Sequence, residues 1–316
     1  MTTTNVSTLP QLNPAEFEAP PLSIWQMAWL RFRRHKMAMF GVVVLLLLIA
    51  YSFGGALVIT EDYANRIDTK MRLSPPNETN PFGTDTIGRD ILARTIYGGQ
   101  ISLMIGLASV VVMLFVGILV GALSGYFGGW IDAILMRFTE ALISIPAIFL
   151  LLVMAKFFGG KVPDIQMFGR SFSGSVIVII IILGLTSWMS LARIVRAEFL
   201  SLKENDFVLA ARAIGTPTWQ IIFRHILPNT IAPIVVAATL GVARAIISEA
   251  YISFLGLGVQ PPTATWGNML EGAYNYIEKA PWLWIFPSSL ILLTVLSINF
   301  VGDGLRDALD PRSRSM

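Results

Sequence analysis

The chain has 316 residues, of which 54% are hydrophobic and only 14% are charged, and its formal net charge is +3. Charged residues make up about a quarter of a typical soluble domain, so this composition excludes an ordinary soluble protein and predicts one membrane-embedded unit. The chain has no cysteine, which excludes a disulfide, a thiolate metal site and a cysteine nucleophile. Basic runs with interleaved aromatic residues are also missing, so we expect membrane lipids and no nucleic acid among the partners.

The N-terminal region divides into a tail and an amphipathic helix. Residues 1–22 are polar and contain four prolines, which predicts a disordered tail. Residues 23–36 predict an interfacial helix capped by Ser23, and a plain juxtamembrane segment is the alternative. One face of this helix carries the aromatic residues Trp25, Trp29 and Phe32. Its end carries the basic residues Arg31, Arg33, Arg34 and Lys36, which place the N-terminus in the cytoplasm.

Six apolar segments are long enough to cross a membrane as helices. They cover residues 37–59, 101–123, 133–155, 171–192, 230–251 and 282–301. Arg193 and Arg196 are expected to end the fourth of them on the cytoplasmic side. The expected fold class is therefore all-α, a polytopic membrane protein with six transmembrane helices. Basic residues gather at 31–36, 193–224 and 306–314, which places both termini and the loop between the fourth and fifth spans in the cytoplasm.

Two outer segments and the tail carry further expectations. Residues 37–98 comprise the first span and an outer loop, in which Thr84 or Asp85 is expected to cap a helix that Gly98 ends. A second short outer helix is expected over residues 266–276. Residues 303–316 are expected to form a cytoplasmic tail.

Four charged residues lie within the predicted spans. Arg137 and Glu140 are three positions apart in the third span, where an ion pair along one helix is the simplest explanation. Pro146 is expected to kink that span. Arg244 and Glu249 lie in the fifth span and must face protein or water, because lipid does not solvate a charge. Each of the two either packs against another helix or subunit, or lines a transport pathway.

The loop between the fourth and fifth spans, residues 200–229, is polar although long apolar segments flank it. Its sequence predicts two short helices, and by pattern alone it is a helical hairpin that links two spans. The first helix is expected over 203–214, with Gly215 as a left-handed cap. Pro217 is expected to begin the second helix, and Pro228 to end it by pushing Leu227 out of helical geometry. One face of the second helix is expected to carry Trp219, Ile222, Phe223 and Ile226.

Within this loop, Ala210, Ala211 and Gly215, followed by the string HILPN, resemble the cytoplasmic "EAA" loop of type I ABC transporter permeases. The first helix of that loop is a coupling helix that docks on the ATPase subunit. The family signature begins with Glu, and this chain has Leu209 at that position. The resemblance implies a coupling role for the residues Asp206, Leu209, Ala210, Ala211, Arg212, Gly215, Thr216 and Pro217.

Three further strings resemble the C-type permeases of dipeptide, oligopeptide and nickel ABC systems. They are GTDTIGRDILARTIYG, FLGLGVQPP with WGNML after it, and GDGLRDALDP. With the loop, the resemblance covers residues 23–312 and implies the type I ABC importer permease fold, with the core over 99–302. It also implies a peptide importer in a bacterial or archaeal cytoplasmic membrane. The implied partners are a second permease, two ATPases that hold ATP and magnesium, and an extracytoplasmic binding protein.

The sequence lacks the motifs of an enzyme. The string FFGGKV has neither the first glycine of a phosphate loop nor a Ser or Thr after Lys161, and no HExxH or GxSxG string occurs. We therefore expect no catalytic residue, no metal site and no cofactor in this chain. A nickel or other small-solute permease is the alternative on substrate, and a secondary transporter is a further alternative that would require inverted repeats.

Overall fold

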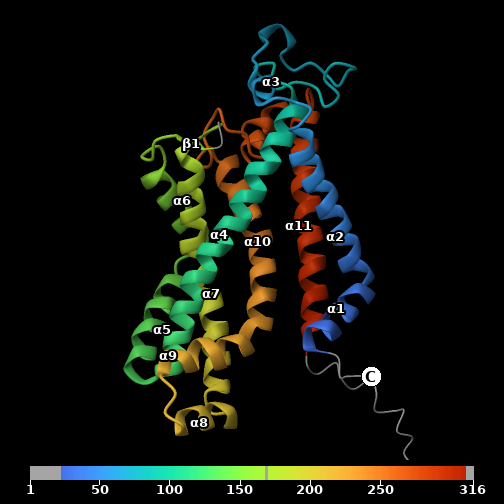
Figure 1. Ribbon diagram of the computed structural model, residues 1–316. Coiled ribbons are helices and arrows are strands. Elements are labelled where there is room, and N and C mark those ends of the chain that lie inside the picture. The colour runs from blue at the N-terminus through green and yellow to red at the C-terminus, as the bar shows by residue number, and fades with distance from the viewer. Residues whose placement is uncertain (1–22, 168–169, 311–316) are drawn as a thin grey trace, which may run out of the picture.

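The structure is a computed structural model that describes residues 23–167 and 170–310. The predicted tail over 1–22 lies outside the described residues, as do the last six residues of the chain. Within the described residues, five helices are long and apolar enough to cross a membrane, and a bent pair makes a sixth crossing if it is counted as one span. Figure 1 shows them as a bundle with α3 at one end and α8 at the other, and we call these the α3 end and the α8 end.

The first two helices meet at His35. Helix α1 (Ile24–Arg34) begins with the predicted cap, since Ser23 Oγ accepts from Gln26 N and Gln26 Oε1 accepts from Ser23 N. It ends at Arg34 because His35 Nδ1 accepts from Ala38 N and so caps α2 (Lys36–Ile49). A π-helical turn, Ala50–Gly54, continues α2, and the first span ends there, before the predicted limit at residue 59.

Helix α4 (Ile91–Phe127) corrects two expectations. Its cap is Asp90, whose Oδ1 accepts from Ala93 N, and Thr84 and Asp85 lie outside it. The helix does not end at Gly98 but continues for a further 29 residues. An internal glycine costs about 1 kcal/mol in a helix. Here the loss is offset by packing, because a Cβ on Gly98 would lie 3.1 Å from the backbone of Thr265.

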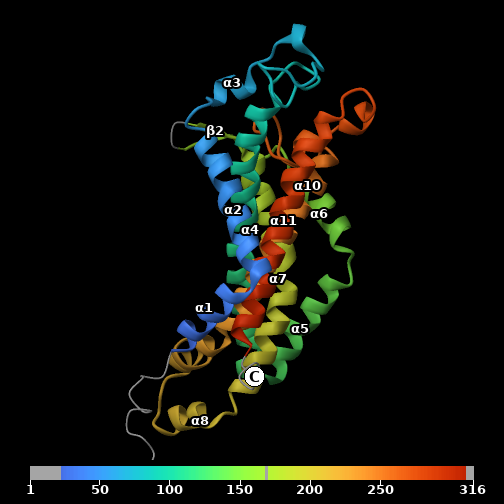
Figure 2. The same ribbon diagram turned by 90° about the vertical axis from the view of Figure 1, so that its right-hand side faces the viewer.

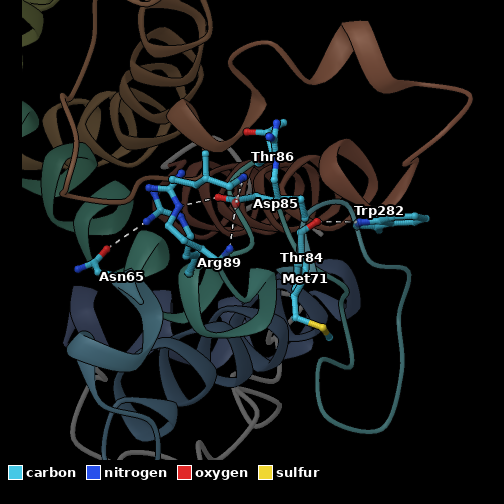
Figure 3. A network of polar contacts seen from close by, with 10 residues as sticks. Asn65, Met71, Thr84, Asp85, Thr86, Arg89 and Trp282 are labelled. Carbon is cyan, nitrogen blue, oxygen red and sulfur yellow. Dashed lines mark hydrogen bonds and ion pairs between the residues drawn. The ribbon is translucent and has the colours of Figure 1, made fainter. Parts of the chain in front are cut away.

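The segment before α4, residues 60–90, is a folded loop that includes α3 (Glu61–Asn65) and a 3-10 turn, Thr69–Met71. Asp85 Oδ1 accepts from the backbone N–H of Ile87 and of Arg89, and Asp85 Oδ2 pairs with Arg89 Nε at 2.6 Å. Figure 3 shows this network beside Trp282, whose Nε1 donates to the carbonyl of Thr84. This hydrogen bond attaches the 60–90 loop to the start of α11.

The third predicted span is broken rather than kinked. Helix α5 (Gly129–Ile143) and helix α6 (Ala147–Phe158) meet at an angle of 86°. Pro146, the predicted kink, precedes the first residue of α6, where its missing N–H removes a hydrogen bond that a continuous helix needs. Figure 2 shows the two halves beside α7 with the break between them. A hairpin of β1 (Ile165–Met167) and β2 (Arg170–Phe172) follows.

Helix α7 (Gly174–Leu202) is longer than predicted, since it passes residue 192 without a stop. Its second half packs closely on α4. A Cβ on Gly117 would lie 2.8 Å from Leu191, and one on Gly125 would lie 2.6 Å from Phe199 Cβ. Small residues of this kind allow membrane helices to approach closely. The packing carries α7 through the two arginines that were expected to end it, Arg193 and Arg196.

The second helix of the 200–229 loop does not stop at Pro228. A helical turn α9 (Thr218–Gln220), a π-helical turn Ile221–Ile226 and a 3-10 turn Leu227–Thr230 lead directly into α10 (Ile231–Phe254). Leu227 is helical, with φ −55° and ψ −41°. Three of the four residues predicted to share a face do so, because Trp219, Ile222 and Phe223 line one apolar cavity beside α4. The fourth, Ile226, is fully buried and does not line that cavity, since the π-helical turn alters the helical register that the prediction assumed.

The last predicted elements are also altered. Residues 266–276 form two 3-10 turns, Asn268–Leu270 and Ala273–Tyr276, rather than one short helix. Helix α11 (Trp282–Leu309) includes residues 303–309, the first half of the predicted tail over 303–316. Its extra turns are held by α1 and α2, since Phe32, Ala38 and Ala308 belong to one buried cluster.

Candidate coupling helix and transmembrane charges

Helix α8 (Asp206–Ala213) lies at the far end of the molecule, beyond the ends of the long helices (Figures 1 and 2). One face is anchored. Val208 is 0% exposed and Ala211 is 5% exposed, and both belong to a buried cluster with Phe199, Ile222 and Ile226. The helix begins later than the predicted residue 203, because Lys203 is the C-cap of α7 and Asn205 is the N-cap of α8.

The opposite face of α8 is apolar and exposed. Leu209, at the position of the family's glutamate, is 44% exposed, and Ala210 beside it is exposed as well. Phe207 and Ile214 are also exposed, at 40% and 83%. Sequence reasoning did not single out these two residues, because the family signature does not include them. Exposed apolar side chains that gather at one end of a protein are typical of a docking surface.

The end of α8 has the geometry of a Schellman motif. Gly215 has φ +80°, its N–H donates to Arg212 O, and Thr216 N donates to Ala211 O. Gly215 therefore has the left-handed conformation that the sequence predicted. Pro217 precedes α9 as its cap, so a sharp turn separates the two helices.

Helix α8 stands on a polar base formed by α4, α5 and α7. The Arg196 guanidinium on α7 binds Asp132 on α5 through two hydrogen bonds of 2.5 and 2.6 Å. Asp132 also accepts from Ser124 on α4. Lys203 Nζ donates to Gly125 O, and the guanidinium carbon of Arg212 lies 5.3 Å from the centre of the Tyr126 ring. Arg212 therefore faces the bundle rather than the exposed face of α8.

The four transmembrane charges do not form one site. Arg137 and Glu140 form the expected ion pair, at 3.3 Å, and their side chains are 86% and 61% exposed. Glu249 is fully buried, where its Oε1 accepts from Ser253 at 2.7 Å and its Oε2 from Ser102 at 3.4 Å. Arg244 is exposed on another face of α10 and lines a cavity of about 490 Å³.

The buried Glu249 ties three segments together. Ser102 on α4 donates to the glutamate and accepts from the backbone N–H of Trp266. Trp266 is itself fully buried, and its Nε1 donates to Thr95 O of α4. The glutamate therefore holds α4, α10 and the 265–268 turn in contact. No local sequence pattern indicates this contact, because the three segments are far apart in the chain.

A long-helix bundle with a short helical projection between two of its long apolar segments, here α7 and α10, is the architecture of a transport permease. Residues 117–315 match the family described as "Binding-protein-dependent transport system inner membrane component", and residues 23–76 match the "N-terminal TM domain of oligopeptide transport permease C". The chain belongs to the first of these families, which consists of transport permeases rather than enzymes.

Relatives of known name cover nearly the whole chain. A putative peptide permease protein of Brucella suis is 44% identical over 90% of this chain and 89% of the relative. The oligopeptide transport system permease protein OppC of Haemophilus influenzae is 39% identical over 95% of this chain and 92% of the relative. The dipeptide transport system permease protein DppC of Alkalihalophilus pseudofirmus is 37% identical, over 97% and 96%.

A solved structure shares the fold. One chain of "Inward facing conformations of the MetNI methionine ABC transporter" matches with a TM-score of 0.53 at 23% identity, over 68% of this chain and 95% of that chain. The fold is thus the expected multi-pass, all-α fold of a type I ABC importer permease.

Proposed function

We propose that this chain is one permease subunit of an ATP-driven importer of dipeptides or oligopeptides, and that α8 is its coupling helix. The relatives named as peptide permeases support the substrate class. The observation that carries the coupling role is the two-sided character of α8. Val208 and Ala211 anchor one face to the bundle, while Leu209 and Ala210 are presented on the other.

Coupling follows from how α8 is attached. A short helix held between a turn at one end and a left-handed cap at the other transmits a push as a rigid body. The polar base under α8 joins α4, α5 and α7 through Asp132 and Arg196, so a push on α8 moves several spans together. A bidentate arginine–carboxylate pair of this kind combines strength with a fixed geometry.

The partners follow from what the chain lacks. Its sequence contains no phosphate loop, so ATP and Mg²⁺ belong to separate ATPase subunits. ATPases of this class act as a pair and this chain has one α8, so a second, homologous permease completes the transporter. A substrate-binding protein delivers the peptide at the α3 end. The membrane is the bacterial or archaeal cytoplasmic membrane, with both termini and α8 in the cytoplasm.

Reconstitution tests this function directly. The complete transporter, in liposomes with ATP inside the compartment that α8 faces, is expected to accumulate a radiolabelled dipeptide or tripeptide only when the binding protein is present. A variant ATPase that cannot hydrolyse ATP is the control. Uptake of radiolabelled nickel with no uptake of any peptide would contradict the peptide assignment and favour the alternative solute.

A further inference from the structure

The cavity that Arg244 lines runs between α7, α10 and the end of α11. On α7 its wall extends from Ser187 to Glu198, and on α10 from Ala232 to Arg244. Each wall therefore covers three helical turns, or about 17 Å at 1.5 Å per residue. A cavity of about 490 Å³ lies within the range of small-molecule sites.

The two walls run in opposite directions, and this sets the ends of the cavity. Helix α7 runs towards the α8 end and α10 runs away from it (Figure 1). Glu198 and Ala232 therefore lie at the same end of the cavity, where Arg306 and Asp310 of α11 also line it. Ser187 and Arg244 lie at the other end, deep within the span. The cavity thus has a mouth with charges of both signs and an inner end with an arginine.

The charge at the inner end is not neutralised within the described part of the chain. Among those residues, Arg244 has no ion-pair or hydrogen-bond partner, and its side chain is exposed into the cavity. The nearest acid along α10, Glu249, is fully buried against Ser102 and Ser253. A guanidinium within a membrane span has to face water or an anion, because lipid does not solvate it.

We propose that Arg244 binds the C-terminal carboxylate of a peptide inside this cavity, with the peptide's ammonium group directed towards the mouth. The proposal rests on the proposed function and adds a recognition site to it. A guanidinium binds a carboxylate through two parallel hydrogen bonds. The hydroxyls of Ser187 and Ser190 line the same wall and supply partners for peptide groups. A wall of about 17 Å accommodates about five extended residues at 3.3–3.6 Å each.

The first test measures the field of Arg244 without requiring transport. Because the chain has no cysteine, Ser190→Cys places a single thiol of this chain in the cavity wall. In the assembled, nucleotide-free transporter, this thiol is modified with anionic and cationic thiosulfonates of similar size. We expect Arg244→Gln to lower the ratio of the anionic rate to the cationic rate about fivefold, the effect of one unit charge several ångströms away in water.

Two controls accompany this measurement. Arg244→Lys keeps the positive charge and is expected to keep the ratio. Lys70→Gln removes an exposed positive charge at the α3 end, outside the cavity lining, and is also expected to leave the ratio unchanged. An identical ratio with and without Arg244 would overturn the proposal, since the arginine would then exert no field in the cavity.

The second test uses the ligand itself. An unlabelled dialanine with a free carboxylate is expected to slow modification of the Ser190→Cys thiol several-fold, whereas its C-terminal amide has little effect. Arg244→Gln is expected to abolish this difference, and Arg244→Lys to restore part of it. Equal protection by both peptides, or protection by neither, would overturn the proposal.

Peptide uptake and co-purification of the subunits distinguish a failure of the carboxylate site from a failure of the proposed function. If the wild-type transporter accumulates peptides but the carboxylate gives no protection, the carboxylate site is wrong and the proposed function stands. If the wild type accumulates no peptide, the proposed function itself fails. If Arg244→Gln prevents co-purification of the second permease, then Arg244 is a subunit contact and the proposal is overturned.

Discussion

At the scale of single residues, α10 shows that two charged residues in the same membrane-spanning helix can have different structural environments. Arg244 and Glu249 are five positions apart in the same helix. Glu249 is fully buried and accepts hydrogen bonds from two serines, whereas Arg244 faces a cavity. The buried carboxyl group of Glu249 holds neighbouring segments together through its hydroxyl partners. The guanidinium of Arg244 is exposed in the cavity, where we propose that it binds a ligand.

Glu249 gives the prediction at this scale. Glu249→Ala leaves the hydroxyls of Ser102 and Ser253 without their acceptor, so we expect the free energy of unfolding to fall by about 2–3 kcal/mol. Glu249→Gln keeps an acceptor in place and is expected to retain most of the stability and the peptide uptake. Thermal unfolding of the purified transporter and an uptake assay measure the two effects. Loss of uptake by a normally assembled Gln variant would instead assign Glu249 to the pathway.

At the scale of elements, two glycines perform different tasks. Gly215 ends α8 because its φ of +80° is open to glycine and strained for most other residues. Gly99 lies within α4 at φ values that any residue adopts, and there the missing side chain makes room. A Cβ on Gly99 would collide with Ser52 Oγ and would lie 2.6 Å from the Trp266 ring.

We expect Gly215→Val to weaken the cap of α8 by about 1–2 kcal/mol, because a β-branched residue is strained in the left-handed region. A Cβ at this position would meet no atom within 4 Å, so we expect the effect to come from the backbone conformation. Binding of the ATPase subunits in a pull-down, and ATP-coupled uptake, are both expected to fall. Gly215→Asn is the matched control, since asparagine tolerates this conformation. Unchanged binding and uptake with valine would refute the role of α8 as a coupling lever.

The other element-level prediction concerns Gly99→Ala. The added methyl group separates α4 from Ser52 and Trp266, so we expect a loss of about 1–3 kcal/mol in the free energy of unfolding. Gly54→Ala is the control, because Gly54 is also helical and a Cβ there would meet no atom within 4 Å. Thermal unfolding of both variants in detergent compares the two. Equal melting temperatures would mean that α4 does not pack on Trp266 in the membrane.

At the scale of the whole molecule, the two ends differ in structure. The α3 end is a folded loop attached to α4 and α11. At the α8 end, a short helix projects beyond the polar contacts that join α4, α5 and α7. The proposed orientation places α8 in the cytoplasm and the loop outside. Alternating access would then carry a motion from one end to the other through the α4–α7 contact.

Single cysteines test this orientation. In intact cells, a membrane-impermeant maleimide is expected to label Lys70→Cys and to spare Ala210→Cys, and inverted vesicles are expected to reverse the pattern. Both positions are exposed in this chain, and the inverted vesicles are first stripped of the ATPase subunits, so that burial against a partner does not explain the result. Labelling of Ala210→Cys from outside intact cells would invert the assigned topology.

Much of the fold was predictable because it depends on local chemistry. Length and apolar composition determine the spans, Ser23 and Gly215 determine helix ends, and Pro146 determines the break in the third span. The resemblance carried by Ala210, Ala211 and Gly215 located α8. These signals are short in sequence, and each has a direct backbone consequence.

Two of the errors about helix ends have the same cause, which is contact between distant segments. Gly98 was expected to end a helix, but α4 continues because the 265–266 backbone packs on it. Arg193 and Arg196 were expected to end the fourth span, but α7 continues because Asp132 and the glycines of α4 hold it. A local pattern contains no information about such partners.

The amino-acid sequence by itself determined that the chain crosses a membrane several times, that it has no phosphate loop, and where its short projecting helix lies. Only the tertiary structure decided which face of α8 is exposed. It also decided that Glu249 is buried among hydroxyl groups, whereas Arg244 lines a cavity. The physical reason is that solvation of a side chain depends on every segment packed around it, whereas helix ends and spans depend on neighbours in the chain.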